Sequence, residues 1–224
     1  MNRIKTVFGV LILLLGFAMI CLCGYLIFRN EQESRAAAQA VTDDLPQLKE
    51  QIAAQAGDPD NTLYQRYLLG DAYSSADTAP DEADTVIPLD GYSYLGYLTF
   101  LTLGMELPVM DTWDAQRLRR APCRYYGSAE THDLVIAAHN YRSSFGQCRN
   151  LQIGDEIRFT DAAGIVHKYT VGEIEIVEPN AVEYMIRSDW NLSLYTCTYS
   201  GTQRLTIRCT EQRDAAEPLS ENAM

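Results

Sequence analysis

Residues 191–209 read NLSLYTCTYSGTQRLTIRC, two runs of alternating residues separated by a short turn. The alternation is typical of two β-strands, and Ser200-Gly201 supplies the turn, so the segment predicts an antiparallel hairpin. Cys197 would end the first strand and Arg204 would begin the second. As cross-strand neighbours, their Cβ atoms would lie about 4.5–5.5 Å apart. A guanidinium at that distance can favour the thiolate of Cys197 or bind an oxyanion formed at its sulfur.

The hairpin alone leaves two alternatives open. Cys197 can be a small core residue and Arg204 a surface residue, although alternation places Ser193, Tyr195 and Cys197 on one face of the strand. Arg208 follows Arg204 by four residues, lies on the same face, and competes for the same role.

From Val86 onward, short β-branched and aromatic runs alternate with turns rich in Gly, Asn and Asp. This texture, with about seven or eight strands, predicts an all-β barrel or sandwich. The runs are YLGYLTF (94–100), ELPVM (106–110), DLVIAAHN (133–140), GDEIRFTD (154–161), HKYTVGEIEIVEP (167–179), NLSLYTCTYS (191–200) and RLTIRC (204–209).

A histidine follows one of these runs directly. Residues 134–138 are all apolar and predict a buried strand, so His139 emerges where that strand ends. Taken alone, His139 can be structural or catalytic. His132 and His167 lie in polar, turn-like contexts. Three scattered histidines without a C-x-x-C pair form no metal-ligand pattern, so we expect neither a metal nor a cofactor.

The N-terminal region predicts a membrane anchor. Residues 7–28, VFGVLILLLGFAMICLCGYLIF, are uncharged and apolar, and a helix of this length spans a bilayer core of about 30 Å. Arg3 and Lys5 precede the run and acidic residues follow Arg29, which favours a cytoplasmic N-terminus and a C-terminal body outside the cytoplasm. We therefore expect a single-pass protein of the cell membrane.

Composition divides the rest of the chain. Residues 29–72 carry amphipathic helical patterns, which we expect Pro46 and the GDPDN at 57–61 to break into pieces. The predicted organisation is a cytoplasmic N-terminus (1–6), a transmembrane anchor (7–28), a helical stalk and linker (29–84), a catalytic β-barrel (85–210) and a flexible tail (211–224).

Charge and cysteine content exclude some functions. A net charge of −12 argues against a nucleic-acid partner, and we expect the RLRR at 117–120 to be solvated. Cys21 and Cys23 fall inside the apolar run. Of the remaining cysteines, Cys123 and Cys148 form the first disulfide pairing to test, because disulfides are stable outside the cytoplasm.

The order of the motifs resembles the sortase family. Sortases carry a strand-borne histidine, often Gly-His-Asn, then Thr-Leu-x-Thr-Cys, then an arginine a few residues on. This chain has Ala138-His139-Asn140, then Ser193-Leu194-Tyr195-Thr196-Cys197, then Arg204. Further segments resemble the sortase opening strand (94–110), the segment after the histidine (144–161) and the two strands that follow (167–179). The chain departs from the family pattern at Ala138, Ser193 and Cys148, where Gly, Thr and Leu are common. These departures remove no catalytic group and leave the sortase class unassigned.

The resemblance implies an eight-stranded sortase β-barrel with short helices, and a cysteine transpeptidase. Cys197 would attack a sorting signal similar to Leu-Pro-x-Thr-Gly between Thr and Gly. His139 would serve as acid and base, and Arg204 would stabilise the oxyanion or hold the substrate backbone. The implied partners are sorting-signal-bearing surface proteins or pilins, and an amine on a peptidoglycan precursor or a pilin.

The resemblance also implies substrate-binding residues. Thr196 would contact the substrate or orient the arginine. The connection at 177–190 corresponds to the loop that lines the substrate groove, so Tyr184 and Trp190 either form an apolar pocket or pack a short helix beneath the barrel. The sequence shows no distinct calcium signature. A catalytically silent barrel used for binding or assembly is the alternative function, although it would be free to lose His139, Cys197 or Arg204.

Overall fold

The computed structural model describes residues 2–56, 85–198 and 200–212, with no side-chain detail before residue 7. The GDPDN at 57–61, the rest of the predicted stalk and linker through residue 84, and residues 213–224 of the predicted tail lie outside this part of the chain. In chain order, the described elements are α1 (Asn2–Ala56), β1 (Ile87–Leu89), β2 (Tyr92–Phe100), β3 (Met105–Met110), η1 (Arg117–Arg119), β4 (Cys123–Tyr126), β5 (Leu134–Ala137), η2 (Phe145–Asn150), β6 (Glu156–Asp161), β7 (Val166–Val177), α3 (Val182–Ile186), β8 (Leu192–Cys197) and β9 (Arg204–Glu211).

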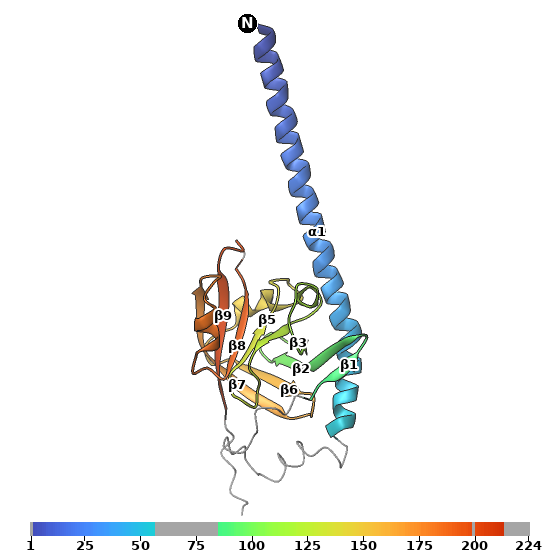
Figure 1. The fold of residues 1–224 in the computed structure, drawn as a ribbon, viewed down its shortest axis with the longest axis vertical. Coiled ribbons are helices and arrows are strands. Elements are labelled where there is room, and N and C mark those ends of the chain that lie inside the picture. The colour runs from blue at the N-terminus through green and yellow to red at the C-terminus, as the bar shows by residue number, and fades with distance from the viewer. Residues whose placement is uncertain (1, 57–84, 199, 213–224) are drawn as a thin grey trace, which may run out of the picture.

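The strands close into a barrel of the predicted kind. Within the described residues, strands β2, β3, β4, β5, β8, β9, β7 and β6 pair in that order, and β2 pairs with β6 to close the ring of eight. The short β1 pairs with the first residues of β2, outside this ring. Each of these strands therefore has a partner on both sides, although β3 and β4 share only the pair of Met110 with Cys123. Figure 1 shows the barrel beside the lower half of α1.

Two details of the strand prediction are wrong. Residues 167–179 are similar to two family strands, but β7 runs unbroken through most of them, with a register shift between Val171 and Glu173. Gly172 lies at that shift, and the ring of Trp190 packs where its side chain would be. The prediction also missed β1 and β4, which have only three and four residues and too little periodicity to detect.

The prediction that Pro46 breaks the N-terminal helix is also wrong. α1 is continuous from Asn2 to Ala56 with Pro46 inside it. Proline removes one helical hydrogen bond and crowds the preceding turn, a cost of about 3 kcal/mol. The flanking turns are held by the barrel, because Asp44 and Leu48 are both fully buried. Tertiary contacts therefore keep the helix intact through the proline.

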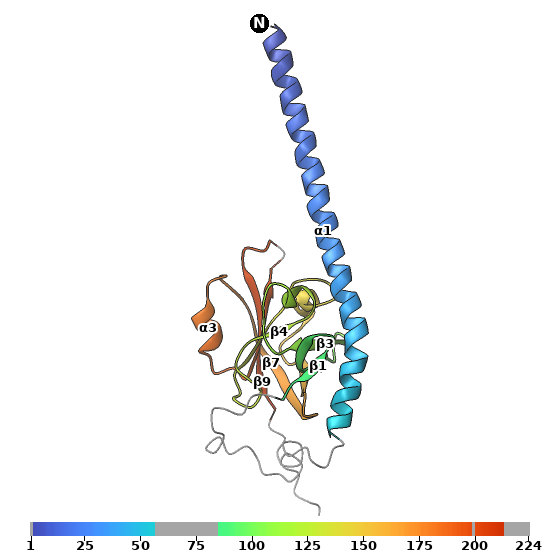
Figure 2. The same cartoon turned by 45° about the vertical axis from the view of Figure 1, so that its right-hand side comes forward.

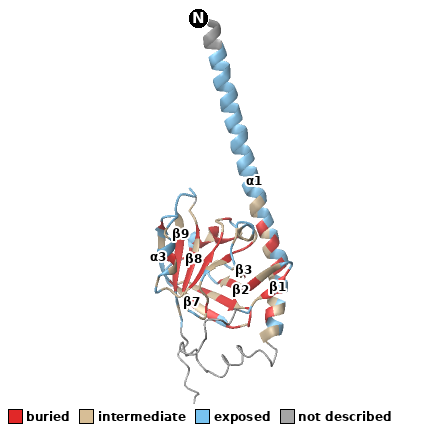
Figure 3. Ribbon diagram, in the orientation of Figure 1, coloured by how far each residue is buried: buried red, intermediate tan, exposed pale blue. Residues whose placement is uncertain are grey.

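The lower half of α1 is part of the globular domain rather than a free stalk. Leu48 and Ile52 pack with Ile87, Tyr94 and Met110 in one core cluster. Burying each of these aliphatic side chains contributes about 1.5–3 kcal/mol. Figure 3 shows the change from an exposed upper helix to a buried face along the barrel.

A buried ion pair fixes the same contact. The Asp44 carboxylate accepts hydrogen bonds from the Tyr94 hydroxyl at 2.6 Å and from the Arg120 guanidinium at 2.7 and 3.0 Å. Arg120 also lies over the ring of Tyr92, 5.0 Å from its centroid. Arg120 is therefore held against the helix, and the expectation that all of 117–120 is solvated is wrong for this residue.

The upper half of α1 contains the predicted membrane segment. Its most apolar window has a mean hydropathy of 2.8, and none of that window is buried in the protein. The exposed large hydrophobic side chains of α1 lie between Val7 and Phe28. By length and composition, this helix can cross a membrane.

Candidate active site

Strand register brings His139 and Cys197 to the same end of the barrel. β5 and β8 are parallel neighbours, and Ala137 pairs with Tyr195. His139 and Cys197 each follow that pair by two residues. β5 is buried along its whole length, as predicted from its apolar run, so the chain turns outward only after Ala138.

Hydrogen bonds hold the segments on both sides of the histidine. The Ala138 N–H donates to the Tyr195 carbonyl at 3.0 Å, and the Thr196 hydroxyl donates to the Ala138 carbonyl at 2.8 Å. The side chain of Asn140 donates to the Thr198 carbonyl at 3.0 Å. His139 is therefore fixed between two residues that are bonded to the immediate neighbours of Cys197.

Arg204 lies opposite Cys197, as the sequence predicts. β8 and β9 form the expected hairpin, and Cys197 is the direct cross-strand partner of Arg204. The Arg204 Nη1 donates to the carbonyls of Gly201 and Gln203 in the turn, both at 3.1 Å. These bonds hold the guanidinium at the turn, at the same end of the barrel as the thiol.

Arg208 occupies a different environment. It lies four residues further along β9, about 13 Å away at 3.3 Å per residue. Its fully buried guanidinium donates to the carboxylate of Glu175 at 2.8 Å and to the hydroxyl of Ser193 at 2.9 Å. It also lies 4.9 Å from the ring centroid of Tyr184. Of the two candidate arginines, the structure brings only Arg204 to Cys197.

The environment of His139 favours a neutral imidazole. Burial lowers its pKa below the ordinary value, the carboxylate of Glu33 opposes that shift, and the guanidinium of Arg119 adds to it. The ring stacks on that of Tyr141, with centroids 4.7 Å apart and planes at 21°. A neutral imidazole at this position can accept a proton at pH 7.

Thr196 connects the cysteine strand to the histidine segment. Its side chain is buried, and its hydroxyl is used by the Ala138 carbonyl. Strand alternation directs Thr196 to the opposite face from Cys197. The structure thus shows a clamp between β8 and the end of β5, while the predicted substrate contact of Thr196 stays a prediction.

The structure does not bring Tyr184 and Trp190 together with Cys197 in the same way. The connection at 177–190 contains the short helix α3, which Figure 2 shows on the outside of the barrel. Tyr184 is half exposed, and its hydroxyl donates to Glu175 at 2.8 Å. Trp190 packs on Gly172 just before β8 begins, at the far end of that strand from Cys197. The connection thus contains a short helix, while the predicted substrate contact of Tyr184 and Trp190 stays a prediction.

An aromatic row beside the cysteine was missed. Tyr195 shares its strand face with Cys197 and stacks on Tyr125 at 6.4 Å, and Tyr125 lies 5.4 Å from Trp113. The alternation of β8 identifies Tyr195 from sequence. The other two rings come from β4 and the connection before it, which only the fold places there.

The predicted disulfide between Cys123 and Cys148 is wrong. All six cysteines lie in the described residues and all are free. Cys123 packs in the cluster beneath α1, where burial raises its pKa to about 12, whereas Cys148 packs in the barrel interior. The two thiols are separated because each fills its own hydrophobic core.

The expectation that His167 lies in a turn-like context is also wrong. It lies within β7 rather than in a turn and is buried between Asp161 and Glu211. In the described part of the chain, no group of three or more His, Cys, Asp or Glu residues could hold a metal ion.

A thiol, an imidazole and a guanidinium at one end of a closed β-barrel define a candidate cysteine-nucleophile site. The family model of the sortase domain matches residues 100–212, just over half of the chain and including all three groups. The chain belongs to the sortase family. A comparison with curated proteins finds no match.

Solved sortase structures share the fold. Sortase C of Streptococcus pneumoniae is 21% identical, with a TM-score of 0.54 over 74% of this chain and 96% of that chain. A pilus-related sortase C of group B Streptococcus is 19% identical, with a TM-score of 0.53 over 74% and 97%. The pilus island 1 sortase C2 of group B Streptococcus is 18% identical, with a TM-score of 0.51 over 70% and 100%. Identities this low show the fold and assign no class.

Proposed function

We propose that this chain is a membrane-anchored sortase that cleaves a sorting signal resembling Leu-Pro-x-Thr-Gly and transfers the product to an amine. The observation that carries the proposal is the strand register, which pairs Cys197 with Arg204 and brings His139 to the same barrel end. Membership of a family of cysteine transpeptidases supports the reaction type.

In the first step, the neutral imidazole of His139 takes the proton of the Cys197 thiol, and the thiolate attacks the carbonyl carbon of the Thr residue in the Thr-Gly bond. The tetrahedral intermediate collapses, the C–N bond breaks, and His139 gives a proton to the departing Gly amine. A thioester between Cys197 and the Thr carbonyl remains. In the second step an incoming amine attacks this thioester, His139 takes its proton, and the thiolate of Cys197 leaves.

Arg204 would stabilise the negative oxygen of both intermediates or hold the substrate backbone. Its position opposite Cys197 supports either role, because both need a donor within reach of the reacting carbonyl. The carbonyls of Gly201 and Gln203 orient its guanidinium before substrate arrives.

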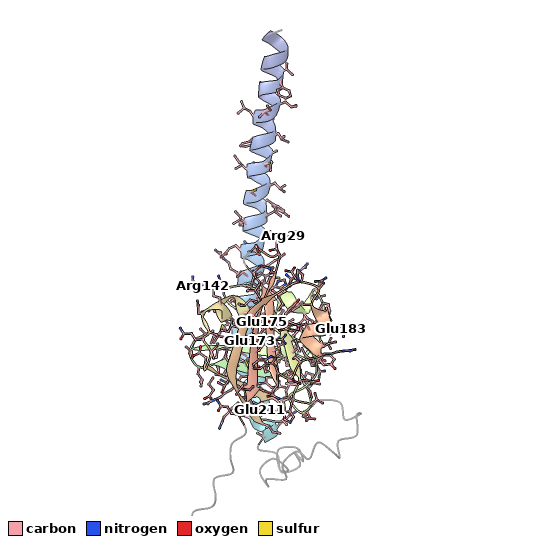
Figure 4. All side chains as sticks on the ribbon, turned by 90° about the vertical axis from the view of Figure 1, so that its left-hand side faces the viewer. Arg29, Arg142, Glu173, Glu175, Glu183 and Glu211 are labelled. Carbon is pink, nitrogen blue, oxygen red and sulfur yellow. The ribbon has the colours of Figure 1, made fainter. Side chains whose placement is uncertain are left out.

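The arrangement of α1 supports an active site close to the membrane surface. The predicted span ends at Phe28, and Glu33, which contacts the segment after His139, follows about 7.5 Å along the helix axis. Figure 4 shows Arg29 and Arg142 at the end of the barrel from which α1 projects, and Glu211 at the opposite end. With the N-terminus in the cytoplasm, the barrel would stand outside and reach surface proteins or pilins that are still tethered to the bilayer.

The test uses the full chain in lipid nanodiscs with a fluorogenic library of Leu-Pro-x-Thr-Gly-like peptides. We expect cleavage, and a thioester adduct on Cys197 detected by mass spectrometry. Equal turnover by Cys197→Ala would sink the mechanism. Tight peptide binding with neither cleavage nor adduct would instead favour the catalytically silent barrel.

A further inference from the structure

The helix α1 contacts the segment that carries the histidine. The Tyr141 hydroxyl donates to the carboxylate of Glu33 at 3.1 Å, and the Ser143 hydroxyl donates to the Ser34 carbonyl at 3.3 Å. Both helix residues lie in the turns that directly follow the apolar span. The ring of Tyr141 also stacks on the imidazole of His139, with the two ring centroids 4.7 Å apart.

Tyr141 is held tightly on the side away from the helix. It is 7% exposed, and its backbone carbonyl accepts hydrogen bonds from the N–H groups of Ser144 and Gly146, both at 3.0 Å. A Cβ at Gly146 would lie 2.3 Å from the Asn140 carbonyl oxygen, so the loop closes around a position that only glycine fits. These contacts fix the backbone of Tyr141. The hydrogen bond from its hydroxyl to Glu33 then fixes the orientation of the ring.

Two charged groups act on the pKa of His139, and they come from different elements. Glu33 on α1 favours the protonated imidazole, and Arg119 on η1 opposes it. Glu33 is itself paired with Arg29, at 3.4 Å, and its side chain is 30% exposed. Among the residues the structure describes, Glu33 is the acidic group that acts against the burial of His139.

We propose that Glu33 and Tyr141 are positioning residues for His139, so that the juxtamembrane turn of α1 completes the active site. This inference rests on the proposed function for its kinetic consequence. The stacked ring fixes the imidazole plane toward Cys197, and the carboxylate fixes the ring. A barrel whose α1 is displaced keeps its nucleophile but loses the orientation and charge balance of its acid-base group.

The experiment uses the full chain in nanodiscs with ring-labelled histidine, followed by NMR across pH. Glu33→Gln keeps an acceptor for Tyr141 and a good helix former but removes the charge. Tyr141→Phe keeps the stacked ring and removes the hydrogen bond, and Tyr141→Ala removes both. Glu31→Gln is the matched control, because Glu31 lies on the same helix, is exposed and pairs with Arg35.

We expect Glu33→Gln to move the titration of His139 to lower pH, with His132 and His167 unchanged. The acidic limb of the kcat/KM profile should move in the same direction. Tyr141→Ala should lower kcat/KM about 3- to 10-fold through loss of the stacked ring. Tyr141→Phe should recover most of that loss, and Glu31→Gln should behave like the unmodified chain.

Two outcomes would overturn the inference. One is an unchanged His139 titration and ring resonance in Glu33→Gln and Tyr141→Ala, with both variants folded by circular dichroism. The other is an equal effect of Glu31→Gln. If the unmodified chain cleaves no sorting peptide, the proposed function fails, but the NMR arm still decides whether α1 positions His139.

Discussion

Each end of the barrel holds a histidine, partly buried His139 at one end and buried His167 at the other, and the pKa values of the two are shifted in opposite directions. At the end nearest the apolar helix, burial lowers the pKa of His139, with a ring and one more distant carboxylate beside it. At the other end, burial alone would lower the pKa of His167, but the hydrogen bonds that its ring donates to the carboxylates of Asp161 and Glu211 raise it to about 9. Figure 4 shows Glu211 at this second end.

The neighbours of each histidine decide whether it can transfer a proton or is held in a structural ion pair. An imidazole bonded on both nitrogens to carboxylates holds its proton and cannot exchange it during a reaction near pH 7. An imidazole without such a pair titrates where proton transfer is useful. Burial is common to both sites, so the difference comes from the neighbouring carboxylates.

Replacing His139 with glutamine gives the largest expected effect on turnover, and His167→Gln is the matched variant. His139→Gln should lower kcat/KM for the sorting peptide by roughly 10³–10⁴-fold with little change in stability, since it removes the acid-base group. His167→Gln should retain turnover and lose stability instead. Steady-state cleavage and guanidinium unfolding of both variants check this, and loss of turnover in His167→Gln would break the comparison.

The two arginines of β9 give the next effect. Arg204→Lys should lower kcat about 10²–10³-fold, because a lysine cannot reproduce the fork of donors at the reacting carbonyl. Arg208→Lys should keep turnover, and Arg208→Met should destabilise the fold by about 3–5 kcal/mol, because it leaves Glu175 without its partner. The same kinetic and unfolding measurements apply. A larger kinetic loss for Arg208→Lys would transfer the catalytic role to that residue.

The pH dependence of stability sharpens the contrast. The pKa of His167 rises from its ordinary value of 6.5 to about 9 on folding, so its contribution is fully present below pH 6.5 and is lost as pH rises through 9. The free energy of unfolding should fall by roughly 3 kcal/mol across that window. Denaturant unfolding at several pH values measures it. His167→Gln should flatten the profile, and an unchanged slope in that variant would assign the loss to other groups.

The smallest expected effect concerns the clamp between the strands. Thr196→Val removes the hydroxyl that bonds the Ala138 carbonyl and should cost about 1 kcal/mol of stability. Turnover should fall by a few-fold, because the histidine segment loses one of its anchors. Thr206→Val is the control, since its hydroxyl contacts only the weak sulfur acceptor of Met185 among the bonds described. Equal kinetic losses in both variants would remove the clamp from the mechanism.

Much of the candidate site was readable from the sequence. The cross-strand pairing of Cys197 and Arg204 followed from alternation and a two-residue turn signal, both of which are local. The buried strand before His139 was equally local. The choice between Arg204 and Arg208 could not be made in this way, because both lie on one strand face. The structure distinguishes them, since Arg204 pairs with Cys197 whereas Arg208 is buried against Glu175.

Other features depended on contacts between distant segments. The disulfide prediction failed because Cys123 and Cys148 pack in separate cores. The sequence left open whether Trp190 lines a substrate pocket or packs against the barrel, and only the fold places its ring over Gly172. The contact of Glu33 with Tyr141 joins residues more than a hundred positions apart, and neither has a local pattern that reports the other.

The sequence by itself determined the apolar span, the β-rich body and the order of histidine, cysteine and arginine, because these are set by composition, periodicity and turn residues along a few neighbouring positions. Only the tertiary structure decided that α1 continues through Pro46, that its lower half is bound to the barrel, and that its juxtamembrane turn reaches the tyrosine beside His139. Those features arise from burial and hydrogen bonding between segments far apart in the chain, and such interactions exist only once the barrel has closed.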